Sequence, residues 1–279
     1  MQKIDLHVHT NCSDGSFSPA GAVLEAKRLG LKAIAITDHD SAEGCAEAMS
    51  TGEKCGVEVV KGIEITAKLG TAIHILGYYI DETSSEIYSF LKWIQEDREK
   101  RNKKMAQLMA DDGLDISYER MCEKYEGIIG RPHFAQELVD LGLAYSVNDA
   151  FKRYVNKGCR YFIGRTVISV DTAVKMIASA GGVPVLAHPY QYKRNDAELR
   201  ELIEFAMKNG LRGMECRYSG YSEEQTRYLE NIADEYGLLK TGGSDFHGSF
   251  KPHIKMGTGI SENLSVPYEY LEKLKQAVN

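Results

Sequence analysis

The sequence predicts an α/β protein with a parallel sheet, open or closed into a barrel, and helices that cover it. Short apolar segments typical of buried strands alternate with amphipathic segments that begin at helix caps and end at glycines. Strands that alternate with helices in this way pair in parallel. Of the 279 residues, 43% are hydrophobic and 27% are charged, so the chain can build a sizeable core.

The N-terminal part of the chain supplies four expected strands and one well-marked helix. The helix begins at Ser18 and Pro19, because the serine hydroxyl caps free N–H groups and proline fits the first turn. Gly30 ends this helix. The expected strands are residues 3–8, 33–37, 58–66 and 73–80.

The same alternation returns in the C-terminal part. Gly181 and Gly182 end one helix, and a capping box formed by Ser222 and Gln225 begins another. The expected helices are residues 171–180, 198–208 and 222–236, and the strands that follow them are residues 184–187, 213–216 and 238–241.

Residues 84–158 interrupt this pattern, because they are helix-like almost throughout. We therefore expect a helical insertion subdomain at 84–158 between two parts of one domain, 1–83 and 159–279. The charged run 96–104 is interpreted as a solvated helix face, with a basic edge that faces substrate as the alternative.

Composition excludes several classes of protein. The formal net charge of -6 argues against a basic face that tracks along nucleic acid, although it is compatible with a small anion pocket. No apolar stretch approaches the length of a membrane span, and the N-terminus resembles no signal peptide. The six cysteines form no CxxC pair, which favours reduced thiols in a cytoplasmic protein.

Polar side chains gather where the expected strands end. Because these ends form one rim in an α/β fold, the side chains should converge there. His7 and His9 lie two residues apart in one strand and therefore point to the same side. The other members of this group are Asp38, His39, Glu64, His74, His188, Asp245 and His247.

A mixture of imidazole and carboxylate groups predicts a site for divalent metal ions. A lone histidine usually has a structural role. A set of six histidines with interleaved carboxylates is different, because without a ligand it would bury unpaired polar groups and mutually repelling charges.

The same residues resemble the motifs of the polymerase and histidinol phosphatase (PHP) superfamily of metal-dependent phosphoesterases. The helical insertion, with its GRPHF segment at 130–134, is similar to the branch of nucleotide phosphatases and 5'-3' exoribonucleases. The matching motifs are DLHVHT at 5–10, SDG at 13–15, ITDHD at 36–40, GIEIT at 62–66, HILG at 74–77, AHP at 187–189 and GGSDFHG at 242–248.

The resemblance implies a distorted seven-stranded (β/α) barrel that holds three divalent ions, with manganese favoured and iron or zinc as alternatives. Asp38 would orient a liganding imidazole. The implied ligands are His7, His9, Glu64 and Asp245 for the first ion, Glu64, His74 and His188 for the second, and Asp14, His39 and His247 for the third.

This site would hydrolyse phosphate esters of small nucleotides, of the AMP or nucleoside 3',5'-bisphosphate type. A hydroxide between the two ions that Glu64 bridges would attack phosphorus. Arg131 is the leading phosphate-binding candidate, and His133 would position the substrate or protonate the leaving group. Arg165 and Lys157 are further candidates for substrate binding.

The chain departs from the family pattern at Gln191, where relatives often carry an arginine. This difference leaves other substrates open: a cyclic sugar or nucleotide phosphate, or short 5'-phosphorylated RNA. A regulatory module that binds metal without catalysis is the alternative outside the enzymes. No obligate protein partner and no membrane association are expected.

Overall fold

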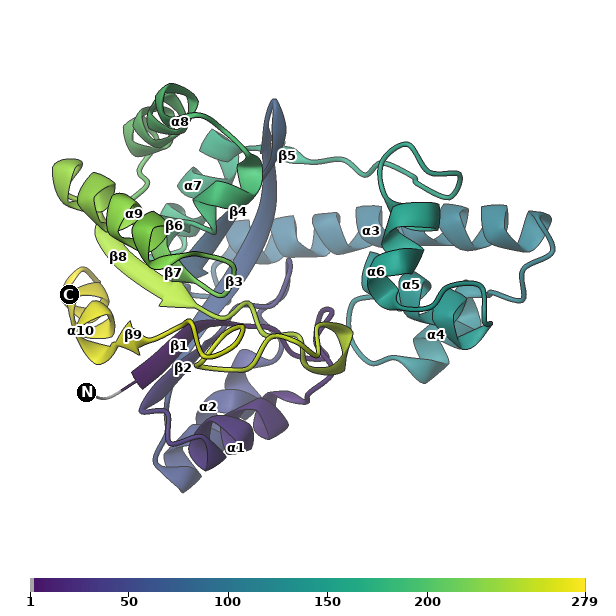
Figure 1. Ribbon diagram of the computed structural model, residues 1–279, viewed down its shortest axis with the longest axis horizontal. Coiled ribbons are helices and arrows are strands. Elements are labelled where there is room, and N and C mark those ends of the chain that lie inside the picture. Colours follow the sequence, from purple (N-terminus) through teal and green to yellow (C-terminus); the bar gives the residue numbers. More distant parts are fainter. Residues whose placement is uncertain (1–2, 279) are drawn as a thin grey trace.

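The computed structural model describes residues 3–278, which form a nearly closed, barrel-shaped sheet surrounded by helices, with a helical lobe on one side (Figure 1). The strands lie in the order β8-β7-β6-β4-β3-β2-β1-β9, and β5 pairs with β3. Their bounds are β1 Lys3–Val8, β2 Ala33–Ile36, β3 Glu58–Leu69, β4 Thr71–Tyr78, β5 Ile168–Ser169, β6 Val183–Leu186, β7 Gly213–Tyr218, β8 Leu239–Gly243 and β9 Val266–Pro267. The predicted distorted barrel is confirmed, and β5 and β9 are two-residue additions to the seven longer strands.

The expectation of parallel pairing is wrong for β4, which runs antiparallel to both β3 and β6. The cause is local. Only Gly70, with a φ of 75°, separates β3 from β4, so the chain has to reverse its direction there. A parallel connection would need about a dozen residues or more. The hairpin places Glu64 of β3 and His74 of β4 near each other.

The barrel closes between β1 and the segment that follows β8. The N–H of Asp245 donates to the carbonyl oxygen of His7 at 2.9 Å, and the N–H of His9 donates to that of Phe246 at 3.0 Å. Gly243 lies against His7 so closely that an added Cβ would come within 2.3 Å of the His7 Cβ. The closure therefore brings His7 and His9 beside Asp245, a residue far away in the sequence.

Alternation along the strands divides the apolar side chains between separate cores. Ile34 and Ile36 of β2 pack in one cluster with α1 and α2, whereas Ile63 and Ile65 of β3 pack in another with α7, α8 and α9. None of the helices within residues 3–278 is both long and apolar enough to cross a bilayer. The bounds of the helices around the barrel are α1 Pro19–Arg28, α2 Cys45–Cys55, α7 Val170–Ser179, α8 Asp196–Lys208, α9 Glu223–Glu235 and α10 Tyr268–Gln276.

The helical lobe lies beside the barrel and is tied to it by α3 (Figure 1). Ile87 and Ile94 of α3 pack in the core that also contains residues of β3, α7, α8 and α9. Met105 and Met109 of the same helix pack in the core of the lobe. One continuous helix therefore belongs to both the barrel and the lobe. The division of the chain at residue 84 between the barrel domain and the helical insertion stays a prediction. The elements of this region are α3 Ser85–Asp111, α4 Tyr118–Lys124, α5 Arg131–Asp140, α6 Val147–Ala150 and a π-helical turn at Phe151–Val155.

Replacement of Gly243 by alanine tests the closure of the barrel. The new methyl group would overlap the backbone and Cβ of His7, which have no room to move, so we expect Gly243→Ala to lower the free energy of unfolding by about 2–3 kcal/mol. Chemical denaturation measures this loss. Gly164→Ala is the control, because its Cβ would meet nothing within 4 Å, and its stability should change by less than about 1 kcal/mol. Equal stability of the two variants would contradict the tight contact.

Candidate metal centre and substrate cavity

Glu64 is the centre of the predicted cluster. It lies on the face of β3 opposite to Ile63 and Ile65, and it is 1% exposed. Its Oε1 is 2.7 Å from Nδ1 of His74 and 3.1 Å from Nε2 of His188. Its Oε2 is 3.1 Å from Nδ1 of His39, 3.3 Å from Nε2 of His9 and 3.6 Å from Nε2 of His7. One buried carboxylate thus faces five imidazoles.

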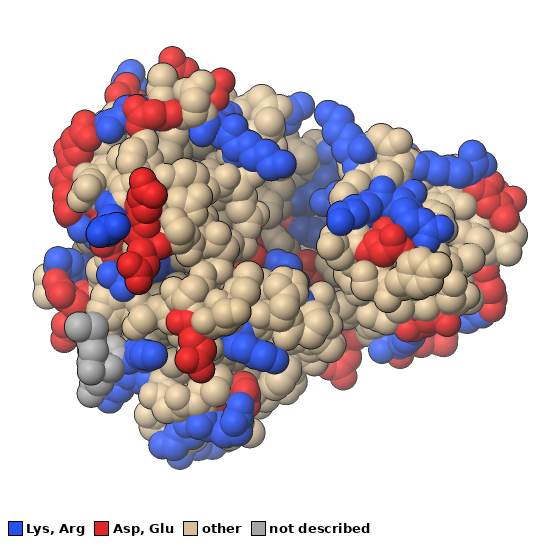
Figure 2. Space-filling model, viewed as in Figure 1, with Lys and Arg blue, Asp and Glu red and all other residues tan. Residues whose placement is uncertain are grey.

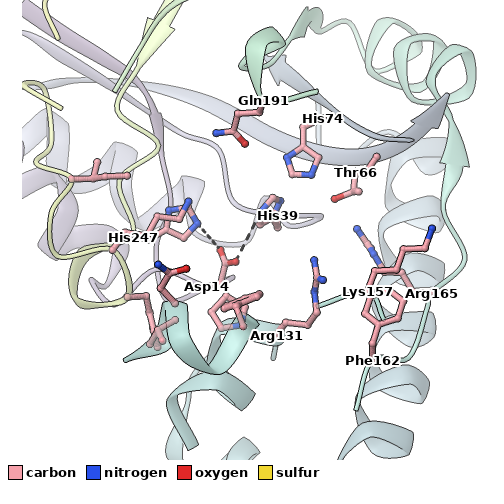
Figure 3. Close-up of a pocket in the computed structure, with 18 of the residues that line it drawn as sticks. Asp14, His39, Thr66, His74, Arg131, Lys157, Phe162, Arg165, Gln191 and His247 are labelled. Atoms are coloured by element: carbon pink, nitrogen blue, oxygen red, sulfur yellow. Dashed lines mark ion pairs between the residues drawn. The ribbon is translucent and has the colours of Figure 1, made fainter. Parts of the chain in front are cut away.

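Two more carboxylates lie beside these imidazoles. Oδ1 of Asp245 is 3.3 Å from Nε2 of His9, while its Oδ2 accepts hydrogen bonds from the Tyr218 hydroxyl and the Lys251 ammonium, both at 2.8 Å. Oδ1 of Asp14 is 3.2 Å from Nε2 of His247, as one dashed line in Figure 3 shows. All nine expected ligands therefore converge from six separate segments of the chain.

The donor atoms of this cluster fit divalent metal ions. Sets of three or four of them lie within 4.8 Å of one another, so each set could ligate one ion. The mixture of imidazole nitrogen and carboxylate oxygen is the type that first-row metals accept. Buried nitrogens without a hydrogen-bond partner are Nε2 of His7, both ring nitrogens of His9, Nδ1 of His39 and Nδ1 of His188. Burial of unpaired polar atoms is costly, and a bound cation relieves that cost.

The ionisation of the cluster also favours positive charge inside it. Burial alone would raise the pKa of Glu64, but His74, His39 and His7 hold it well below its usual range. Burial alone would lower the pKa of His9, but hydrogen bonds with Asp245 and Glu64 raise it to about 9. Protons on the imidazoles and metal ions therefore compete for the same carboxylates.

Glu215 orients the ring of His7 and holds the backbone of His188, and sequence reasoning missed it. This residue of β7 is fully buried, and its Oε1 lies 3.0 Å from Nδ1 of His7. Its Oε2 accepts the backbone N–H of His188 at 2.8 Å. A hydrogen bond at Nδ1 fixes the ring, so that Nε2 of His7 faces Glu64 and Asp245. The only sequence signal was an acidic residue within an apolar strand.

Asp38 does not have the expected role of orienting an imidazole. Its carboxylate accepts hydrogen bonds from the N–H of Thr10 at 2.7 Å, the Thr10 hydroxyl at 2.6 Å and the Ser13 hydroxyl at 2.5 Å. These bonds fix the loop that carries Asp14. Asp38 thus acts on the cluster by holding a backbone segment, which a short-range sequence pattern could not indicate.

A cavity of about 890 Å³ opens above the cluster, between the barrel and the helical lobe. In Figure 2 the surface is hollowed between these two bodies, with lysine and arginine side chains along the hollow. Several expected site residues line this cavity: Asp14, His39, His74, Arg131, Lys157, Arg165, Gln191 and His247. His7, His9, Glu64, His188 and Asp245 lie beneath it, in the buried part of the cluster.

The solvated face expected for residues 96–104 is wrong for two of the arginines. Arg98 and Arg101 are 8% and 6% exposed, and both line the cavity. They lie three residues apart and therefore share one face of α3, the face that points toward the barrel. The alternative, a basic edge that faces substrate, describes them better. The charge run hid them, because most of its other charged members are exposed: Glu96, Glu99, Lys100, Lys103 and Lys104.

The residues predicted to bind substrate lie on two opposite sides of the cavity. Arg131 lies with its guanidinium 5.8 Å from the ring centres of both Phe151 and Phe162, and it faces the cavity (Figure 3). Arg165 and Lys157 lie on the same side as Arg131, and Gln191 lies across the cavity beside His74 (Figure 3). The side-chain amide of Gln191 donates a hydrogen bond to the Tyr218 hydroxyl. Arg131, Arg165 and Lys157 therefore lie across the cavity from Gln191 and His74.

His133 does not fit the expected contact with substrate. It is 2% exposed and lies outside the lining of the cavity. Its Nδ1 accepts the N–H of Gly130 at 2.8 Å, and its ring packs against Tyr125 and Phe250. Burial lowers its pKa to about 4, so the ring is neutral near pH 7. His133 therefore caps the start of α5.

Comparison with known proteins agrees with this site. The family model of the PHP domain matches residues 5–210. The chain is 33% identical to a 5'-3' exoribonuclease of Haemophilus influenzae over 247 residues, which cover 88% of this chain and 90% of that protein. It is 32% identical to a 3',5'-nucleoside bisphosphate phosphatase of Chromobacterium violaceum over 251 residues, with 88% of each chain covered.

A solved structure also matches over almost the whole length. It is described as a putative metal-dependent phosphoesterase from Bifidobacterium adolescentis, and it superposes with a TM-score of 0.87 at 32% identity. The match covers 98% of this chain and 95% of that one. The barrel and the helical lobe therefore occur together in that protein as well.

Replacement of Glu215 by glutamine should weaken metal binding. The amide keeps the size of the side chain but removes the negative charge beside Nδ1 of His7, so we expect divalent-metal affinity to fall by about 10–100-fold. Metal content after dialysis against graded chelator concentrations measures the change. Glu230→Gln, which affects a carboxylate paired with Arg217 outside the cluster, should retain normal affinity. Unchanged affinity in Glu215→Gln would contradict the orienting role.

Asp40 should make the stability of the protein depend on pH in acid. Burial alone would raise the pKa of its carboxyl, but Arg165 and Arg98 outweigh burial and lower it to about 2. A depressed pKa stabilises the fold above the unfolded-state value near 4, and this stabilisation is lost as pH falls through 2. The contribution is about 2 kcal/mol at pH 7 and about 1 kcal/mol at pH 3. The difference in unfolding free energy between wild type and Asp40→Asn should therefore shrink between these two pH values, and a constant difference would refute the shift.

Proposed function

The chain belongs to the PHP-domain family and is a metal-dependent phosphoesterase, and from this premise we propose that it removes phosphate from small nucleotides, with a nucleoside 3',5'-bisphosphate as the preferred substrate. The observation that carries the proposal is that one cavity joins the carboxylate–imidazole cluster to a wall of arginines. The cluster suits the reacting phosphate, and the arginines suit a further anionic group of the same molecule.

We assign three divalent ions to the cluster, with manganese as the native metal. The unpaired imidazole nitrogens and the separations within the cluster support this assignment. When bound, the ions supply an activated water and neutralise charge on the phosphoryl oxygens. The first ion would be held by His7, His9, Glu64 and Asp245, the second by Glu64, His74 and His188, and the third by Asp14, His39 and His247. The donor atoms of His7, His9 and Asp245 lie within 4.8 Å of one another, as do those of Asp14, His39 and His247, whereas Glu64 groups with His39 and His74 and also with His7 and His188.

The protein side chains prepare the cluster and orient the substrate. Glu215 fixes the ring of His7, and Asp38 fixes the loop that carries Asp14. Lys251 and Tyr218 hold Oδ2 of Asp245, so that Oδ1 faces the imidazoles. Each of these contacts reduces the reorganisation that the site would otherwise need during the reaction.

Hydrolysis of short 5'-phosphorylated RNA is a second candidate function. The cavity volume lies near the upper end of the range for small-molecule sites, about 300–1,000 Å³, so more than one nucleotide fits within reach of the cluster. The relative from Haemophilus influenzae is named as an exoribonuclease. The net charge of -6 confines RNA contact to this cavity rather than to an extended surface.

The first experiment is phosphate release from a substrate panel by protein supplied with Mn²⁺. The panel contains adenosine 3',5'-bisphosphate, AMP, a 5'-phosphorylated trinucleotide, a cyclic sugar phosphate and histidinol phosphate. We expect the bisphosphate to have the highest kcat/KM, and Glu64→Gln to lose activity by at least about 10³-fold with its fold retained.

The other outcomes separate the alternatives. Preference for the trinucleotide would favour the exoribonuclease, and preference for the cyclic substrate would link Gln191 to a different specificity. Metal bound at the cluster without turnover of any substrate would contradict the proposed activity and favour a regulatory module. Circular dichroism of Glu64→Gln controls for loss of fold.

A further inference from the structure

The three expected ligands of the third ion lie where the barrel meets the helical lobe. Asp14, His39 and His247 all line the cavity between these two bodies, and the dashed lines in Figure 3 join Asp14 to the other two. Asp14 is also close to the start of α5, because a Cβ added to Gly130 would lie 3.9 Å from the Cβ of Asp14. These ligands are therefore within reach of both the barrel and the lobe.

A segment of the lobe docks on the loop that carries Asp14. The N–H of Ile128 donates to the carbonyl oxygen of Cys12 at 3.2 Å. The neighbouring Gly127 has a φ of 70°, and a Cβ added to it would come within 2.1 Å of the carbonyl oxygen of Asn11. Backbone therefore meets backbone at this contact, which leaves no room for a side chain.

The lobe also packs against the segment that follows His247. The ring centre of Phe250 lies 5.3 Å from that of His133 and 6.5 Å from that of Tyr125. Ser16, at the end of the loop described above, donates its N–H to the carbonyl oxygen of His247 at 3.2 Å. The lobe therefore contacts two segments that are bonded to each other, and each of them carries one ligand.

Helix α3 holds the remaining ligand through the residue beside it. Asp40 directly follows His39, and its Oδ2 accepts hydrogen bonds from Nε and Nη2 of Arg98 at 3.1 and 2.6 Å. The side-chain amide of Gln95 donates to the carbonyl oxygen of Asp40 at 3.2 Å. Because α3 continues into the core of the lobe, the position of His39 is likewise tied to that body.

Several ligands of the first two ions are held from within the barrel instead. Glu215 of β7 contacts the ring of His7 and accepts the backbone N–H of His188. The Tyr192 hydroxyl accepts the backbone N–H of His74 at 2.9 Å. These ligands are fixed by neighbouring strands and turns, whereas those of the third ion also depend on contacts with the lobe.

We propose that the lobe positions the ligands of the third ion through Gly127 and Phe250, so that binding of this ion and docking of the lobe on the barrel stabilise each other. The proposal rests on the proposed function, with its three ions, and deepens it, because it names what controls the occupancy of one of them. A coupling between two sites is reciprocal. Loosening of the lobe therefore weakens one ion of the three, and loss of that ion loosens the lobe.

Gly127→Ala tests the first direction of the coupling. Its methyl group would overlap Asn11, so the lobe segment has to move away from the loop. At chelator concentrations that leave the wild type with all three Mn²⁺ ions, we expect this variant to lose one. Its affinity for that ion should fall at least about tenfold, while its affinity for the other two stays within about twofold. Elemental analysis after dialysis against graded chelator counts the ions.

Gly142→Ala is the matched control. Gly142 also lies in the lobe and has a φ of 72°, so alanine is strained there to a similar degree, but its Cβ would meet nothing within 4 Å. This variant should bind metal like the wild type. Phe250→Ala is the second test if Gly127→Ala fails to fold, because it removes the ring contacts with Tyr125 and His133 and should weaken the same ion.

Asp14→Asn tests the reverse direction. It removes the charge of a ligand that lies in the barrel, and the readout is amide hydrogen exchange in the lobe. With Mn²⁺ present, exchange at residues 125–133 should become at least about tenfold faster than in the wild type, while exchange in α8 stays unchanged. Addition of Gly127→Ala to Asp14→Asn should release no further ion, because both substitutions act on the same one.

These measurements use no substrate, so they separate the coupling from the reaction. If one bound ion of three depends on Gly127 but no phosphate ester is hydrolysed, the proposed reaction is wrong and the coupling stands. The coupling would be overturned by a wild type that binds only two ions, or by an equal loss of affinity for all ions in Gly127→Ala. Exchange at residues 125–133 that is unaffected by Asp14→Asn would overturn it as well.

Discussion

The carboxylate of Glu64 lies within 2.7–3.6 Å of five imidazoles, and much of the molecule is arranged to hold that contact. The β3–β4 hairpin brings His74 to it, and the closure of the barrel brings His7 and His9. The apolar packing of Ile63 and Ile65 on the other face of β3 fixes the direction of Glu64. So much buried charge and polarity is stable only when opposite charges meet, which is why a divalent-metal centre suits this place.

Residues around the cluster hold its ligands in position through hydrogen bonds. Glu215, Asp38 and Lys251 each bind a segment or side chain of the centre without belonging to it. Glu215 and Asp38 reach the centre from strands or loops that are distant in sequence, whereas Lys251 lies six residues after Asp245. Loss of any one of them would therefore alter the position of a liganding group rather than remove it.

The helical lobe supplies one wall of the cavity beside the cluster. Helix α3 begins in the barrel core and continues into the lobe, so it carries Arg98 and Arg101 to the cavity on a rigid element. Asp40 ties this helix to the strand end that bears His39. Arg98, Arg101, Arg131 and Arg165 therefore line the cavity together on the lobe side, and Gln191 lies across the cavity from Arg131 and Arg165 (Figure 3).

The sequence by itself determined the alternation of strands and helices and the helical character of the insertion, because both depend on short-range periodicity and caps. Eight of the nine residues of the cluster followed from their places at the ends of expected strands, and the resemblance to the PHP superfamily added Asp14. Tertiary structure decided the rest. The antiparallel direction of β4 depends on a one-residue connection, and the burial of Arg98 and Arg101 depends on which face of α3 meets the barrel. The roles of Glu215, Asp38 and His133 were likewise invisible, since each is set by partners whose distance in space the order of residues does not specify.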